Sequence, residues 1–237
     1  MEWNDEAIVL SVRHHGEGSV VAHLLTRCHG RHAGLVRGGA GKEARGALQP
    51  GNQIAAWWRG RLADHLGYFR CEVIHAHAAT VLADAGRLGC LSSACALADV
   101  TLPERDPNEP AYADLAVLLA ALPGGDWPAR YVRWELSLLS TLGYGLDLAS
   151  CAASGVTENL AYVSPRSGRA VSAAAGAPYR DRLLPLPGFL SDEAPATETE
   201  VAAGLRLTGH FLLQHVLAPQ NIAMPPARLR LVDRFRQ

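Results

Sequence analysis

The fold is decided by residues 19–37, SVVAHLLTRCHGRHAGLVR. The run Ser19–Arg27 alternates along its length and contains the β-branched residues Val20, Val21 and Thr26, and a second short run, His32–Arg37, follows a turn at His29-Gly30. Successive side chains of a strand point to opposite faces, so short alternating runs bounded by glycine are typical of half-buried strands. This stretch therefore predicts two short strands joined by a tight turn.

Three further runs of the same kind lie on either side of this pair. They are Ala7–Arg13, Asn52–Arg61 and His65–Ile74. The connections are short and contain glycine, except for the longer segment Gly38–Gly51. Five short strands with one longer connection predict a small closed barrel, and the five-stranded OB fold is the first candidate. An SH3-like barrel or part of a sandwich stays open, although strands this short leave edges that favour closure.

Beyond the fifth strand the pattern becomes helical. The helices that we expect are Val81–Val100, Pro110–Leu122, Pro128–Gly143, Thr197–Leu217 and a short one from Pro225. The fourth begins with Thr197 and Glu200 at the spacing of a capping box. Residues 146–190 are rich in Gly, Pro and Ser and predict an irregular insert with at most a small hairpin. We therefore predict an α+β protein, with an OB-fold barrel at 1–78 and a helical domain at 79–237, packed as one rigid unit.

Composition restricts the class of protein. The chain has 237 residues, of which 49% are hydrophobic and 19% charged, with a formal net charge of −1. These values are ordinary for a globular protein. We find neither a targeting segment nor an apolar run near the roughly 18 residues that a membrane span needs, and we expect a cytoplasmic protein. Five cysteines at irregular spacing predict no disulfide framework and no CxxC zinc site.

Positive charge is concentrated in the predicted barrel. Between Arg13 and Arg70 there are nine Arg or Lys residues against three acidic ones. Trp57 and Trp58 point to opposite faces of the fourth strand, so at most one lies in the core. An exposed ring beside arginines suits single-stranded nucleic acid, because bases stack on rings and guanidinium groups hold phosphates. The alternative is that Trp58 closes the barrel end and the arginines are only solvated. The residues that we expect to contact nucleic acid are Arg13, Arg31, Arg37, Lys42, Arg45, Trp58, Arg59 and Arg61.

Motifs for catalysis are missing from the sequence. Gly38–Lys42 lacks the spacing and the following Ser or Thr of a phosphate-binding loop. Neither a Gly-x-Ser-x-Gly elbow nor an HExxH helix occurs. The metal candidates by composition are Cys28 with His14, His15, His23, His29 and His32, but the strand pattern places them on different faces and turns. We predict that the protein is not an enzyme and that it holds no metal and no cofactor.

Segments along nearly the whole chain resemble one known family, in the right order. They are Glu6–Leu10, His15–Glu17, Leu25–Arg27, Gly30–Gly39, Leu48–Gly51, Glu135–Leu139, Leu142–Leu148 and Tyr162–Val171. They resemble RecO, a family of bacterial DNA repair and recombination mediators. The most specific parts are Leu-Gly-Tyr-Gly-Leu-Asp at 142–147 and Ser-Pro-Arg-Ser-Gly at 164–168.

The resemblance implies an OB fold followed by a helical domain, and a function without catalysis. It implies binding of single- and double-stranded DNA and annealing of complementary strands. It also implies contact with the C-terminal tail of the single-stranded-DNA-binding protein SSB, a complex with RecR, and loading of RecA onto coated strands. A tail of this kind needs an apolar pocket with a cation at its rim. Arg130, Arg133 and Arg206 are the rim cations that we consider.

The sequence departs from the family in the insert. Some members carry a four-cysteine zinc module there, whereas Cys151 stands alone in this chain. Ser154, Ser172 and Ala175 occupy the places of its partners. A structural zinc site needs about four ligands, so we expect no zinc and an insert held by packing.

A second departure concerns the 38–48 connection, where Glu43 offsets the positive charge of Lys42 and Arg45. It shifts the expected DNA contact toward the third and fourth strands, and to four residues there: Arg31, Arg37, Arg59 and Arg61. Two other functions stay open. One is an OB-fold module for RNA or tRNA, with the helical body as a dimerisation or docking unit. The other is a metallohydrolase built on the N-terminal histidines.

Overall fold

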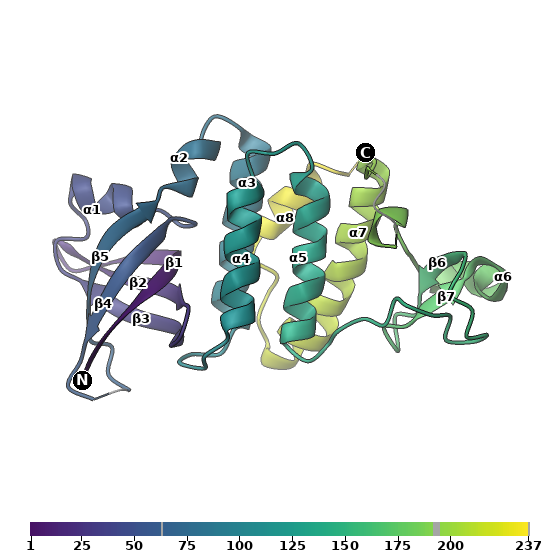
Figure 1. Ribbon diagram of the computed structural model, residues 1–237, viewed down its shortest axis with the longest axis horizontal. Coiled ribbons are helices and arrows are strands. Elements are labelled where there is room, and N and C mark those ends of the chain that lie inside the picture. Colours follow the sequence, from purple (N-terminus) through teal and green to yellow (C-terminus); the bar gives the residue numbers. More distant parts are fainter. Residues whose placement is uncertain (63, 192–194, 237) are drawn as a thin grey trace. The chain divides into compact units, whose positions relative to one another are not determined.

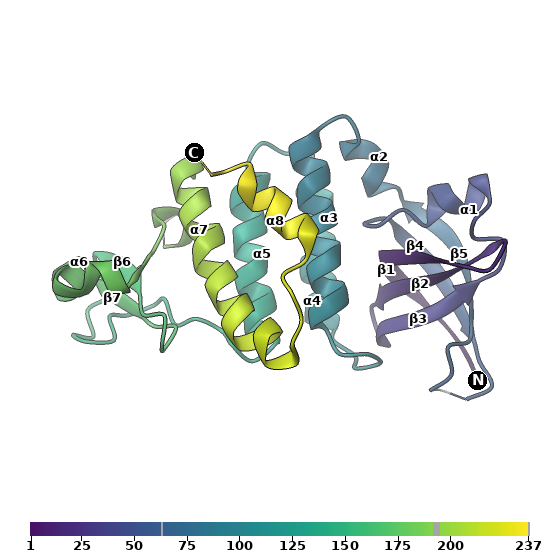
Figure 2. The ribbon, with the colours of Figure 1, turned by 180° about the vertical axis from the view of Figure 1, so that it is seen from behind.

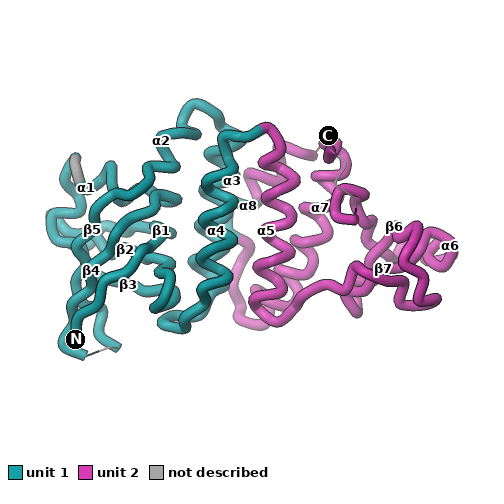
Figure 3. Tube along the Cα trace, viewed as in Figure 1, with its two compact units in different colours: residues 1–124, 225–228 teal, residues 125–224, 229–237 magenta. Residues whose placement is uncertain are grey.

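A computed structural model describes residues 1–62, 64–191 and 195–236. The chain divides into two compact units (Figure 3). The first comprises residues 1–124 and 225–228, and the second residues 125–224 and 229–237. The strands of the first unit give way to helices between His75 and His77. The division into domains at residue 78 stays a prediction, since the first compact unit also holds the helices up to residue 124.

The first unit opens with a five-stranded barrel (Figures 1 and 2). The strands are β1 (Glu2–His15), β2 (Ser19–Thr26), β3 (Gly30–Val36), β4 (Gln53–Arg59) and β5 (Tyr68–His75). They are ordered β1-β2-β3-β5-β4, and antiparallel pairing of β1 with β4 closes the barrel. β3 and β5 run parallel and pair at Leu35 and Tyr68. The predicted OB-type barrel followed by helices is therefore confirmed.

β1 is longer than the sequence predicted, because it begins at Glu2 and not at Ala7. Its first half pairs with β4 and its second half with β2, with a shift of register between Val9 and Ser11. A strand that changes partner in this way joins the two edges of the sheet. The other four strands lie within three residues of their predicted ends.

The connection Gly38–Gly51 contains a helix that the sequence did not predict, α1 (Lys42–Ala47). The side-chain amide of Asn52 donates to the main-chain oxygens of Gly46 at 3.0 Å and Ala47 at 3.2 Å. These bonds satisfy carbonyl groups that the end of a helix leaves unpaired. A residue beyond the connection thus supports the helix, which local pattern does not reveal.

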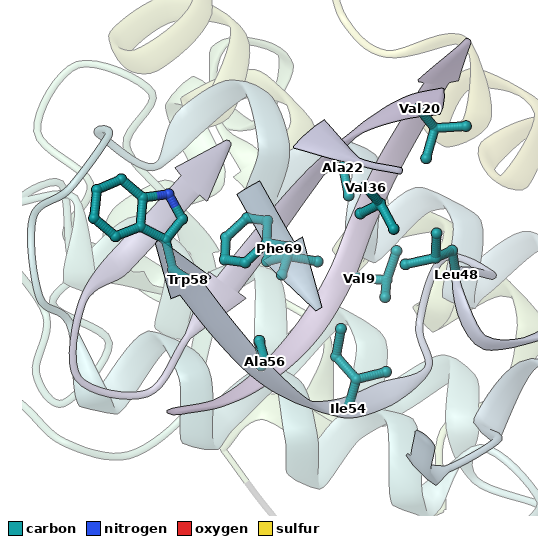
Figure 4. Packing of buried hydrophobic residues seen from close by; sticks show 11 residues of the cluster. Val9, Val20, Ala22, Val36, Leu48, Ile54, Ala56, Trp58 and Phe69 are labelled. Carbon is teal, nitrogen blue, oxygen red and sulfur yellow. The ribbon is translucent and has the colours of Figure 1, made fainter. Parts of the chain in front are cut away.

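Apolar side chains fill the barrel (Figure 4). Those labelled there are Val9, Val20, Ala22, Val36, Leu48, Ile54, Ala56, Trp58 and Phe69. The largest of them, Trp58, donates from Nε1 to the main-chain oxygen of Leu66 at 3.1 Å. A Cβ added at Gly60 or Gly67 would lie 2.4 or 2.5 Å from its ring. Glycines therefore let the 60–67 connection close over Trp58.

His32 lies among rings at this part of the barrel. Its ring centroid is 5.2 Å from that of Trp3, 5.1 Å from Trp58 and 6.0 Å from Phe69. The side chain is buried, and neither ring nitrogen has a hydrogen-bond partner among the described residues. Burial, with the nearby charge of Arg105, lowers the pKa of His32 to about 4. The folded barrel therefore holds a neutral imidazole.

This burial predicts that acid weakens the barrel through His32. The unfolded chain binds the proton near pH 6.5 and the folded chain only near pH 4, so stability falls as pH drops through this window. We expect His32→Phe, which keeps a ring, to lose less free energy of unfolding than the wild type between pH 7 and pH 4.5. Urea titrations at both pH values measure this difference, and equal losses in the two proteins would contradict it.

Three helices complete the main body of the first unit. They are α2 (His77–Val81), α3 (Ala85–Thr101) and α4 (Glu109–Ala121). The sequence predicted one helix over Val81–Val100, but the carboxylate of Asp84 caps the start of α3 and separates it from α2. The side chain of Asn108 caps α4 in the same way.

Asp99 of α3 ties this helix to three strands. Its carboxylate accepts a hydrogen bond from Ser11 Oγ at 2.7 Å and lies 2.8 Å from His23 Nδ1 and 3.5 Å from Arg31 Nη1. Burial acts to raise the pKa of Asp99, but the bonds from His23 and Ser11 and the nearby positive charge hold it below its usual value. The carboxylate is thus kept ionised beneath the barrel.

The second unit is built on two long helices, α5 (Trp127–Thr141) and α7 (Glu198–Phe211). They lie side by side (Figures 1 and 2), and the hydroxyl of Thr208 donates to the buried carboxylate of Glu135. The capping box at Thr197 and Glu200 is confirmed. Beyond α7 the chain forms a π-helical turn, η3 (Leu212–Leu217), and a 3₁₀ turn, η4 (Ala218–Gln220). α8 (Pro226–Asp233) belongs partly to each unit.

The insert contains more regular structure than predicted. Its elements are β6 (Leu160–Val163), β7 (Ala170–Ser172), α6 (Ala173–Gly176), η1 (Ala177–Arg182), β8 (Leu184–Pro185) and η2 (Gly188–Leu190). The strands form a three-stranded sheet in the order β7-β6-β8, where the sequence predicted at most a hairpin. Strands of two to four residues carry too little alternation to be recognised. Among the described residues, every helix is too short or too polar to span a bilayer.

Candidate nucleic-acid interface

A groove lies on the barrel at the seam between β3 and β5. We call it the seam groove. Its lining consists of Val36, Arg37, Ala44, Arg59, Tyr68, Phe69, Arg70 and Cys71. Three guanidinium groups and one tyrosine ring therefore border the same hollow, and they come from the ends of β3, β4 and β5.

Strand alternation explains why these side chains meet. Trp58 of β4 points into the barrel, so its neighbours Trp57 and Arg59 point outward. The register of the β4–β5 ladder sets Trp57 opposite Arg70 and Arg59 opposite Tyr68. Two rings and two guanidinium groups thus alternate across the two strands, each ring facing a cation of the other strand.

Cations already lie over both rings. The guanidinium carbon of Arg70 is 5.4 Å from the centroid of the Trp57 ring, and that of Arg37 is 4.4 Å from the Tyr68 ring. Trp57 is 37% exposed and Tyr68 45% exposed. Rings that are open on the surface and flanked by arginine offer both stacking and charge to a single strand.

The carboxylates near the groove are held weakly. Arg59 Nε lies 3.0 Å from Glu2 Oε1, and Arg70 Nη2 lies 2.6 Å from Glu72 Oε1. All four side chains are more than half exposed. Exposed ion pairs contribute about 0–1 kcal/mol, so a phosphate could replace either carboxylate at little cost.

Trp58, expected from the sequence to contact DNA, does not reach the surface. It is 2% exposed and its ring stacks against Trp3 at 5.7 Å between centroids. The placement of Trp58 at the interface is wrong for a physical reason. Ile54 and Ala56 share its side of β4 and lie in the core, so the outward ring is Trp57.

Arg31 is a second predicted DNA contact that the structure places away from the seam groove. Its side chain is 15% exposed, lies 3.5 Å from both Asp99 and Glu104, and donates from Nε to the oxygen of Leu102 at 2.8 Å. These partners all come from α3 and the segment after it. Arg31 joins β3 to that segment and is not part of the seam groove.

The remaining predicted contacts are exposed but differ in position. Lys42 and Arg45 belong to α1, whose Ala44 lines the groove, so this helix forms one wall. Arg61 lies in the connection after β4, and Arg13 lies on β1, opposite Val21 of β2. Neither belongs to the lining of the seam groove.

Sequence reasoning missed Tyr68, Arg70 and the outward position of Trp57. The signal was present in part, because Ile54, Ala56 and Trp58 are spaced by two and fix which side of β4 is apolar. The residues of β5 that face Trp57 and Arg59 could not be predicted, because the sequence of one strand alone does not determine its register with another.

No group of three or more His, Cys, Asp or Glu side chains that could hold a metal lies among the described residues. His23 and His29 each lie beside a carboxylate, at 2.8 Å from Asp99 and 2.9 Å from Asp5. In the insert, the buried Cys151 Sγ accepts a hydrogen bond from the Ser172 amide at 3.3 Å. Bonds from the Ser154 and Ser172 side chains lower the pKa of this thiol to about 6.

Comparisons with known proteins cover the whole chain. Residues 1–77 match the family model described as Recombination protein O N terminal, and residues 82–221 match Recombination protein O C terminal. The chain is 54% identical over 239 residues to DNA repair protein RecO of Rhodospirillum centenum, covering 100% of this chain and 96% of the relative. Identity to DNA repair protein RecO of Rhodospirillum rubrum is 51% over 245 residues, covering 100% and 97%. The protein of the same name from Cereibacter sphaeroides is 47% identical over 235 residues, covering 98% of each.

Proposed function

The chain belongs to the RecO family of DNA repair proteins, and we propose that it binds single-stranded DNA in the seam groove and on the adjoining ring of Trp57, which lies under Arg70 of the groove lining. The observation that carries this proposal is the alternation of two exposed rings with two guanidinium groups across β4 and β5. Tyr68 and Trp57 would stack on successive bases, and Arg37, Arg59 and Arg70 would neutralise the phosphates between them.

Binding of this kind supports the annealing of complementary strands. Two strands repel each other through their phosphates, and arginines that neutralise one strand let the other approach. We propose that the protein anneals DNA, including strands coated with SSB, and that with RecR it assists the loading of RecA. It would do so without bond-making chemistry, in the cytoplasm and close to the nucleoid. Double-stranded DNA would be bound as the product of annealing.

Contact with the SSB tail requires a cation free to meet a carboxylate. Of the three arginines considered, Arg130 Nε lies 2.7 Å from Asp126 Oδ2. Arg133 Nη2 donates to the oxygen of Phe189 at 2.7 Å. Arg206 is exposed on α7 and forms no ion pair with the residues that the structure describes. The tail pocket therefore stays a proposal, and none of the three arginines is assigned to its rim.

A strand-annealing assay tests the proposed function. Complementary oligonucleotides of DNA, bare or coated with SSB, are mixed with the full chain, and duplex formation is followed by fluorescence quenching. We expect faster annealing in both cases, because the groove neutralises phosphates on either kind of strand. A matched RNA pair is the control for the alternative function. Faster annealing of RNA only, or of neither pair, would overturn the proposal.

A further inference from the structure

A column of aromatic rings in the second unit ends at the surface. The Tyr144 and His215 rings lie 5.6 Å apart between centroids, and the His215 and Phe211 rings 5.6 Å apart with an angle of 14° between their planes. His210 meets Phe211 edge-on at 5.2 Å. Phe211 is buried, whereas Tyr144 is 43% exposed. The column thus runs from the core of the unit to an open tyrosine.

The π-helical turn η3 creates this column. It follows α7 directly and contains His215. A π-helix adds a residue to the turn and so changes the direction of the side chains after it, a feature frequent at functional sites. Here it brings His215 parallel to Phe211 and beneath Tyr144, which follows the end of α5.

Positive charge lies beside the column. His210 Nε2 is 3.4 Å from the oxygen of Pro165, and Arg166, the next residue, is exposed. Arg206 is exposed one helical turn before His210, on the same face of α7. In the part of the chain that the structure describes, neither arginine has an ion-pair partner. A nearby carboxylate, Asp147, is engaged by Arg169 at 3.1 Å.

We propose that Tyr144, His215, Arg166 and Arg206 form a second binding site for a single strand of DNA, which we call the column site. This inference rests on the proposed function of the barrel. A base would stack on Tyr144 and extend the column of rings, while Arg166 and Arg206 hold the flanking phosphates. None of the four residues lines the seam groove. One chain would then hold two strands at once, which would bring complementary strands together for annealing.

The number of strands bound per chain tests the column site. Fluorescent oligonucleotides of about 10 nucleotides, within the usual site size of one such surface, are titrated against the full chain at concentrations just above the wild-type dissociation constants, where a site that has lost about tenfold in affinity stays largely empty. We expect two strands per chain for the wild type and for Tyr144→Phe, which keeps the ring. We expect one strand for Tyr144→Ala and one for the Arg166→Ala/Arg206→Ala double variant.

Two controls keep this result interpretable. Arg180→Ala removes an exposed arginine elsewhere in the second unit and should still bind two strands. An Arg37→Ala/Arg59→Ala/Arg70→Ala variant should bind one strand, at the column site. If the wild type binds one strand and Tyr144→Ala leaves that binding and the annealing rate unchanged, the column site is refuted while the groove stands. If instead the groove variant binds as the wild type does, the proposed function fails.

Annealing gives a second readout. Loss of a stacked base weakens binding by about tenfold, so Tyr144→Ala should slow annealing by a similar factor, whereas Tyr144→Phe should not. Equal rates for the two variants would refute the role of the ring. A synthetic acidic peptide is then added to the wild type as a competitor. If the peptide displaces the second strand, the one that Tyr144→Ala does not bind, this face binds protein and the proposal is overturned.

Discussion

Replacing Trp58 with alanine is expected to destabilise the barrel by about 3–5 kcal/mol, the usual cost of removing a buried tryptophan. The side chain is 2% exposed and its ring lies against those of Trp3 and His32. The substitution also leaves the oxygen of Leu66 without the bond from Nε1. Urea unfolding of the full chain, followed by circular dichroism and by hydrogen exchange of the strands, measures the loss.

Trp57→Ala is the matched control, since it removes the same side chain one residue away. Trp57 is 37% exposed and lies outside the core, so we expect a loss of less than about 1 kcal/mol. Its DNA affinity should fall, because a ring of the interface is gone. A Trp58→Ala variant as stable as Trp57→Ala would show that Trp58 does not close the barrel.

The Arg37→Ala/Arg59→Ala/Arg70→Ala variant is expected to bind single-stranded DNA about 100-fold more weakly than the wild type. Each arginine lost removes a solvent-exposed ion pair with phosphate of roughly 1 kcal/mol. It also removes a phosphate contact, so the slope of log K against log salt should become less steep by about 2, at ~0.7 for each contact. Fluorescence anisotropy at several salt concentrations measures both quantities.

The control for this variant removes the same number of charges outside the lining of the groove. Arg13→Ala/Arg27→Ala/Arg61→Ala takes away three exposed arginines that lie outside the groove and its α1 wall; the sequence predicted two of them, Arg13 and Arg61, as DNA contacts. We expect a smaller loss of affinity, because only general attraction is reduced. If this control loses more DNA affinity than the groove variant, the DNA contacts arginines outside the seam groove, and the account is contradicted.

Local pattern was sufficient for much of the fold. The five strands and the helices were recognisable because alternation and helical periodicity are written within each segment. The long β1, helix α1 and the small sheet of the insert were not predicted. β1 and α1 depend on residues elsewhere, as Asn52 shows for α1, and the strands of the small sheet are too short to leave a pattern.

The site was predicted only in outline. Arginines of the third and fourth strands were expected to bind DNA, and Arg37 and Arg59 do line the groove. Arg31 is also an arginine on one of these strands. Its guanidinium group, however, pairs with Asp99, 68 positions away in the sequence, in the interior of the first unit. The inward and outward tryptophans were distinguishable in principle, whereas the pairing of Tyr68 with Arg59 required the register of the sheet.

Photo-crosslinking tests most directly the claim that the seam groove holds single-stranded DNA. An oligonucleotide carrying 5-iodouracil is irradiated with the full chain, and the crosslinked peptides are identified by mass spectrometry. Bases stacked on Tyr68 and Trp57 should crosslink to these residues, and the signal should vanish in the Arg37→Ala/Arg59→Ala/Arg70→Ala variant. Crosslinks confined to other parts of the barrel, with none between residues 57 and 70, would contradict the account.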